Sequence, residues 1–81
     1  MHAHVYVTLK RGVLDPQGKA VARSLGTMGY EEVQDVRLGK FIELEIDETD
    51  PARAKERITE MCKRLLANTV IEDFRIEIVG S

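Results

Sequence analysis

Few residues in this chain have the type and spacing of a reaction centre. The only histidines, His2 and His4, stand at the start of the chain, and the single cysteine, Cys62, falls on an apolar helical stripe. Covalent catalysis needs a serine or cysteine nucleophile held against a positioned base. We therefore expect no such pair here, and we interpret Cys62 as a small buried core residue.

Metal and phosphate sites also lack their usual patterns. Cys62 has no second cysteine in a CxxC spacing, and His2 and His4 supply two ligands where a zinc site takes three or four. The sequence leaves open whether these two histidines bind a metal. Gly12 and Gly39 each adjoin a basic residue but form no Walker-type loop. We expect this chain to contribute no catalytic residue, no metal site and no cofactor site.

The acidic residues are numerous, but their spacing is that of solvated charge. Glu43 and Glu45 alternate with apolar residues along a predicted strand. A general acid/base pair would need carboxyl groups held in a cleft with separated pKa values. Alternation along a strand predicts that these two side chains face water instead.

Length and composition limit the classes of protein. The 81 residues are enough for one domain, which we assign to residues 1–81, and a chain of this size buries only about 60% of its unfolded surface. One cysteine permits no internal disulfide, so we expect a homo-oligomer, a dimer or a tetramer, to supply the missing buried area. A net charge of -2 argues against nucleic acid as a partner. Without an apolar run of roughly 20 residues or a signal-peptide core, we expect no membrane segment and a cytoplasmic location.

The first half of the chain predicts a strand, a helix and a hairpin. Residues 3–10 alternate apolar and polar, as a half-buried strand does. Asp15 followed by Pro16 predicts a helix start, and Gly29 a left-handed helix end. Between them Val21, Leu25 and Met28 are expected to face a core. Residues 33–38 and 41–47 are predicted strands joined by a two-residue turn at Gly39 and Lys40.

The second half repeats the pattern with one more helix and strand. Asp50 and Pro51 predict a second helix, whose apolar residues run at helical spacing to a stop at Ala67 and Asn68. Alternation at residues 73–78 predicts a last strand. The expected fold is α+β, a ferredoxin-like βαββαβ domain with a four-stranded antiparallel sheet and both helices on one face. Its other face would expose a polar surface with some aromatics, namely Tyr6, Phe41, Glu43, Glu45, Arg75 and Glu77.

Polar and turn residues gather at the predicted helix start and hairpin. They admit two interpretations: local geometry, in which Asp15 caps, Pro16 starts the helix and Gly39 turns, or a docking surface for a partner. In the second, Arg37 and Lys40 would offer cationic donors to a partner's carboxylates. The predicted interface consists of Asp15, Pro16, Gln17, Arg37, Gly39 and Lys40.

At these residues the chain resembles the PurS family, the small subunits of phosphoribosylformylglycinamidine synthase. The resemblance spans nearly the whole chain and departs from the family at Thr69, where a proline is common. Its motifs are Val7-Thr8-Leu9-Lys10, Gly12-Val13-Leu14-Asp15-Pro16-Gln17-Gly18, Val36-Arg37-Leu38-Gly39-Lys40, and Leu65-Leu66-Ala67-Asn68 running into Ile71-Glu72-Asp73-Phe74.

The resemblance implies a non-catalytic role in de novo purine biosynthesis. It implies a complex that makes an amidine from formylglycinamide ribonucleotide, with ATP used by a synthetase subunit (PurL-type) and glutamine by a glutaminase subunit (PurQ-type). The small subunit would bridge the two and could help to enclose the ammonia path, because free ammonia is largely protonated in water and lost as a nucleophile.

Two other functions stay open at this stage. A stand-alone domain resembling the ACT domains, which share the expected topology, would sense a small molecule between subunits. A small acylphosphatase-like hydrolase would need an arginine-bearing phosphate loop after the first strand and a nearby asparagine. Arg11 alone gives that alternative partial support.

Overall fold

Three strands and two helices make up the fold, which we describe from a computed structural model covering residues 1–80. The elements in chain order are β1 (His2–Leu9), α1 (Pro16–Thr27), β2 (Gly39–Glu45), α2 (Pro51–Met61), the π-helical turn η1 (Cys62–Leu66) and β3 (Glu72–Gly80). Strand β1 lies in the middle of the sheet and pairs antiparallel with both neighbours, in the order β2-β1-β3.

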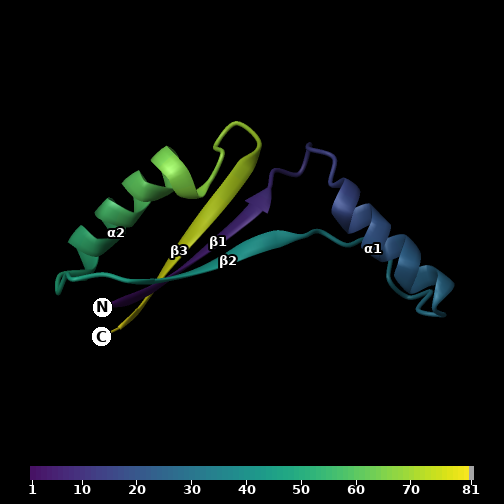
Figure 1. The fold of residues 1–81 in the computed structure, drawn as a ribbon, viewed down its shortest axis with the longest axis horizontal. Coiled ribbons are helices and arrows are strands. Elements are labelled where there is room, and N and C mark those ends of the chain that lie inside the picture. Colours follow the sequence, from purple (N-terminus) through teal and green to yellow (C-terminus); the bar gives the residue numbers. More distant parts are fainter. Residues whose placement is uncertain (81) are drawn as a thin grey trace.

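The core lies between the sheet and α2, which covers one face of it (Figure 1). Ala3, Val5 and Val7 alternate along β1 and are fully buried, as are Ile58 of α2 and Cys62 of η1. Successive side chains of a strand point to opposite faces, so this alternation gives β1 one buried face. The predicted first and last strands and the buried position of Cys62 are confirmed.

Both helices begin as the sequence predicts. Asp15 and Asp50 are N-caps, and a proline follows each as the first helical residue. Each carboxylate accepts a hydrogen bond from a backbone N–H of the first turn that has no partner within the helix. Proline suits the first helical position because it has no N–H that would need a partner there. Gly29, just past α1, has φ 101° and supplies the left-handed helix end.

The predicted hairpin is wrong, because residues 33–38 form no strand and Gly39 and Lys40 form no turn. Gly39 and Lys40 belong to β2, where they pair with Thr8 and Val7 of β1. The polar groups of the preceding segment are held by loop contacts instead: the Leu38 N–H donates to Asp15. Residues 1–80 therefore form a three-stranded sheet in place of the expected four-stranded one.

Helix α1 projects away from the sheet instead of covering it (Figure 1). The radius of gyration is 16.0 Å, whereas a compact domain of this length has about 12 Å. Val21 and Met28 are 38% and 68% exposed, so the prediction that they face a core is wrong within this chain. Without a fourth strand to widen the sheet, no sheet surface lies beneath α1, and the described residues do not form the ferredoxin-like arrangement with both helices on one face.

The sheet face opposite α2 carries the polar and aromatic residues expected there. The rings of Tyr6 and Phe41 lie 5.2 Å apart, and the Arg75 guanidinium lies 4.1 Å from the Tyr6 ring centroid. Phe41 is 51% exposed, so this face is open within the chain. Among the described helices none has both the length and the apolar character to cross a membrane.

Candidate functional site

The candidate site is the junction where β1 ends, α1 begins and β2 begins. The turn residues predicted as a partner interface meet here, although they are separated by more than twenty positions in the chain. Asp15 and Gln17 approach Gly39 and Lys40, and Pro16 opens α1 beside them. The same junction links the sheet to the projecting α1.

Asp15 joins the start of α1 to the start of β2. Its side chain is buried, with one oxygen accepting the Gly18 N–H at 2.8 Å and the other the Leu38 N–H at 2.8 Å. These backbone donors, with the Arg37 charge as a smaller contribution, hold the pKa of Asp15 below its ordinary value. The carboxylate is therefore ionised near neutral pH and fully occupied, which suits a structural cap and not a general base.

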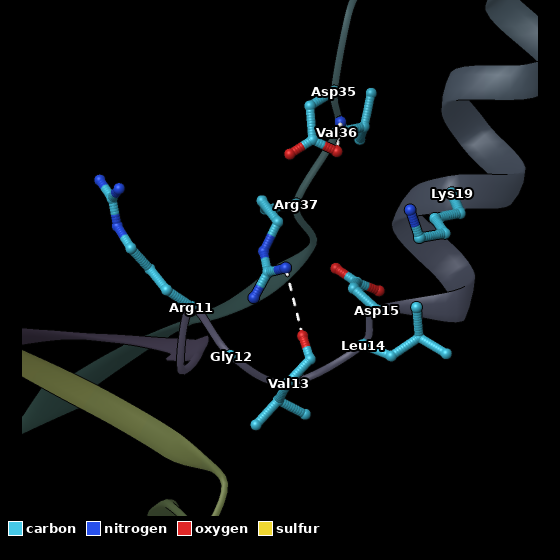
Figure 2. A pocket seen from close by; sticks show the side chains of 9 residues that line it. All are labelled: Arg11, Gly12, Val13, Leu14, Asp15, Lys19, Asp35, Val36 and Arg37. Atoms are coloured by element: carbon cyan, nitrogen blue, oxygen red, sulfur yellow. Dashed lines mark hydrogen bonds between the residues drawn. The ribbon is translucent and has the colours of Figure 1, made fainter.

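Arg37 is the second residue that holds the junction together. Its guanidinium donates to the carbonyl oxygens of Val13 at 3.2 Å, Leu9 at 3.3 Å and Lys10 at 2.9 Å. The bond to Val13 is visible in Figure 2. A planar guanidinium presents several donors in a fixed geometry, so it binds a curved loop better than an ammonium would. Arg37 thus organises the loop after β1, a role that the sequence did not indicate.

Four of the six predicted residues line one hollow, which we call the Lys40 hollow. Its volume is about 240 Å³, and the lining residues are Leu9, Asp15, Gln17, Leu38, Gly39, Lys40 and Glu72. Gly39 is required by close approach: a Cβ there would lie 2.5 Å from the Val7 carbonyl oxygen. Leu9, Leu38 and Glu72 were not predicted, because only the pairing of β1 with β2 and β3 brings them here.

Arg37 and Asp15 share a second hollow, which we call the Arg37 hollow, with a volume of about 290 Å³ (Figure 2). Its other charged residues are Arg11, Lys19 and Asp35, none of which was predicted as interface. The sequence offered one signal for including these three residues, which is that each lies close in the chain to Asp15 or Arg37. The hollow lies between the loop after β1, the first turn of α1 and the segment before β2.

The remaining candidates for chemistry lie elsewhere and are already engaged. Burial raises the pKa of the Cys62 thiol, which keeps it protonated and a poor nucleophile. His4 Nδ1 lies 3.3 Å from the Glu77 carboxylate on the open sheet face. Within residues 1–80 no group of three or more His, Cys, Asp and Glu side chains is placed to hold a metal ion. The junction carries two hollows lined by charged side chains.

Comparison with known proteins places this chain among one set of relatives. A family model described as PurS: Phosphoribosylformylglycinamidine (FGAM) synthase matches residues 2–80. A Bacillus subtilis protein named phosphoribosylformylglycinamidine synthase subunit PurS is 57% identical over 74 residues, which are 91% of this chain and 87% of that protein. A Synechocystis protein of the same name is 49% identical over 98% of this chain and 79% of its own length.

Solved structures match this chain over nearly its whole length. The crystal structure of PurS from Methanocaldococcus jannaschii, described as one of the subunits of formylglycinamide ribonucleotide amidotransferase, matches with a TM-score of 0.90 and 39% identity over 99% of this chain and 96% of that one. A chain in the structure of PurLQS from Thermotoga maritima matches with a TM-score of 0.86 and 30% identity, covering 94% of this chain and 93% of its own.

Proposed function

Because the chain belongs to the PurS family of phosphoribosylformylglycinamidine synthase subunits, we propose that it bridges the synthetase (PurL-type) and glutaminase (PurQ-type) subunits without performing chemistry itself. The membership makes it a subunit of FGAM synthase in purine biosynthesis. The ACT-like alternative has no support among the relatives found.

The observation that carries a role in assembly is helix α1, which packs against no other helix or strand of the described residues. An amphipathic helix of 12 residues gains most of its stability from packing its apolar face, yet Val21 of α1 and its C-cap residue Met28 remain exposed. Leu14, just before the helix, is 64% exposed as well. A chain that leaves its own helix uncovered is suited to completing its core against other polypeptides.

A second copy of this chain is our proposed first partner of α1. Helix α2 lies against β3. On the same sheet face, Ile42 and Leu44 of β2 and Ile46 just after it are only partly buried. The chain therefore exposes a helix that lacks a sheet and a strip of sheet that lacks a helix. Reciprocal packing of two copies would cover both, as an isologous dimer does.

Sedimentation of matched charge variants tests this self-association. Val21→Glu with Met28→Glu introduces two negative charges on the apolar stripe, and Arg23→Glu changes the net charge equally on the same helix. We expect the unchanged chain and Arg23→Glu to sediment at twice the 9.2 kDa chain mass or more, and the double variant at the monomer mass. Monomeric unchanged chain, or an oligomeric double variant, would contradict the proposed contact.

Reconstitution tests the bridging role. In this proposal ATP and glutamine are handled by the partner subunits, and this chain binds no cofactor. Omitting it should abolish glutamine-dependent synthesis and leave synthesis from added ammonia intact, because only the transfer of ammonia between subunits then fails. Undiminished glutamine-dependent synthesis without this chain, or turnover of the substrate by the purified chain alone, would remove the proposal.

A further inference from the structure

The Arg37 hollow has one more positive than negative side chain, on a chain whose net charge is -2. Arg11, Lys19 and Arg37 line it, and among residues 1–80 none of these three lies within 4.0 Å of a carboxylate oxygen. By contrast, Lys10 nearby does pair, with Asp73 at 3.1 Å. Within the described residues, the three cations of this hollow therefore make no direct ion pair, although Asp15 and Asp35 line the same hollow.

The two carboxylates in the same hollow are engaged with backbone N–H groups. Both Asp15 oxygens accept them, from Gly18 and Leu38, and one Asp35 oxygen accepts the Val36 N–H at 2.9 Å. These bonds stabilise the ionised carboxylates and leave their charges in place, so the hollow carries three positive and two negative charges, a net charge of +1. The hollow retains attraction for further negative groups.

The three cations also differ in rigidity. Arg37 is held by its three bonds to carbonyl oxygens, which leave other donors of its guanidinium unused. Arg11 and Lys19 are exposed, and their side chains make no hydrogen bond within the described part of the chain. In Figure 2 they lie on opposite sides of the central Arg37. One fixed cation thus stands between two that are free to move toward a ligand.

We propose that the Arg37 hollow receives an acidic segment of another FGAM synthase subunit, with Arg11 and Lys19 pairing with its carboxylates. The inference rests on the proposed bridging function and names the chemistry of the partner. Single ion pairs between exposed groups are weak, so occupancy requires several carboxylates held on one scaffold, which a small free anion lacks. Arg37, whose charge the sequence assigned to docking, then serves chiefly to shape the hollow.

Charge reversal at the two mobile cations tests the inference. Arg11→Glu with Lys19→Glu alters exposed side chains that hold no internal contact, and Arg53→Glu with Lys55→Glu on α2 makes the same charge change elsewhere. Affinity for purified synthetase and glutaminase subunits, each alone and together, is measured by calorimetry at about 0.05 M and about 0.5 M ionic strength. Circular dichroism confirms that each variant is folded.

We expect the Arg11/Lys19 variant to raise Kd about tenfold at the lower ionic strength and about twofold at the higher one, because salt screens exposed charges. The α2 control should stay within about twofold throughout. Replacement of both residues by alanine should give an intermediate loss of about threefold, and this milder pair replaces the reversal if the latter misfolds.

Several results would overturn the inference. Equal affinity of variant and unchanged chain would do so, as would an equal loss in the α2 control, which would indicate a general charge effect. A variant that loses only self-association would assign the hollow to a second copy of this chain. If the unchanged chain binds neither subunit, the bridging function itself fails, and that outcome is distinct from the others.

Discussion

Replacing Gly39 by alanine tests whether this glycine is a strand residue or a turn residue. In the structure Gly39 pairs with Thr8 inside the sheet, and an added Cβ would lie 2.5 Å from the Val7 carbonyl oxygen and 3.0 Å from the Thr8 Cγ2. Ordinary van der Waals contact begins at 3.4 Å. The obstructing oxygen belongs to backbone, so the new methyl group cannot be accommodated by a side-chain rotation.

The cost follows from separating the two strands at this end. Overpacking a close contact costs about 1–3 kcal/mol, and loosening the pairs at Gly39 and Lys40 removes ladder hydrogen bonds of about 1 kcal/mol each. We expect Gly39→Ala to lower the free energy of unfolding by about 2–4 kcal/mol, a large share of the total for a domain of this size.

Urea denaturation followed by circular dichroism, at one fixed protein concentration, measures this change. With a slope near 1 kcal/mol per molar urea, the midpoint should fall by about 2 M or more. Gly12→Ala is the matched control, because nothing lies within 4 Å of its added Cβ and φ is not positive; its midpoint should shift by less than about 1 M in either direction.

A midpoint for Gly39→Ala close to that of Gly12→Ala would refute the close-approach account of this residue. Asparagine gives a second check. It tolerates the positive φ of a hairpin turn far better than alanine does, so the turn interpretation predicts that Gly39→Asn is the milder change. The strand interpretation predicts that it is at least as damaging as alanine.

Two further predictions concern the cap and the core. The folded-state pKa of Asp15 lies below its ordinary value of 3.8. The contribution of Asp15 to stability should therefore be complete above that pH and should disappear as the pH falls through the lower folded-state value. Asp15→Asn should reduce this loss between neutral pH and pH about 3, and identical pH profiles of the melting temperature for the variant and the unchanged chain would contradict the assignment. Ile58→Ala removes part of a fully buried side chain and should lower the free energy of unfolding by about 2–5 kcal/mol in the same urea assay. Lys55→Ala changes an exposed side chain and should lower it by less than about 0.5 kcal/mol. Comparable losses for the two variants would show that α2 does not pack on the sheet as described.

The sequence by itself determined the elements whose signals are local. Alternation along β1 and β3, the Asp-Pro starts of both helices and the left-handed Gly29 depend on neighbouring residues, and all are present in the structure. The resemblance carried by short motifs was confirmed for the same reason, since those motifs are contiguous in the chain. Of the candidate site, the sequence supplied six residues as one group but none of the contacts between them.

Only the tertiary structure decided how these elements are assembled. Residues 33–38 were predicted as a strand, yet the end of this segment is held as a loop at the junction. The Leu38 N–H donates to Asp15, which is distant in sequence, and Arg37 donates to the loop after β1. Gly39 was predicted as a turn residue because the sequence does not show which residue lies beside it. In the structure the backbone of β1 lies across the sheet from Gly39 and leaves no space for a Cβ, so glycine is required for that reason. The stripe on α1 was correctly identified as apolar, but amphipathicity reveals only that a helix needs a partner. Where that partner lies depends on long-range pairing of strands, and within residues 1–80 no sheet face packs against α1.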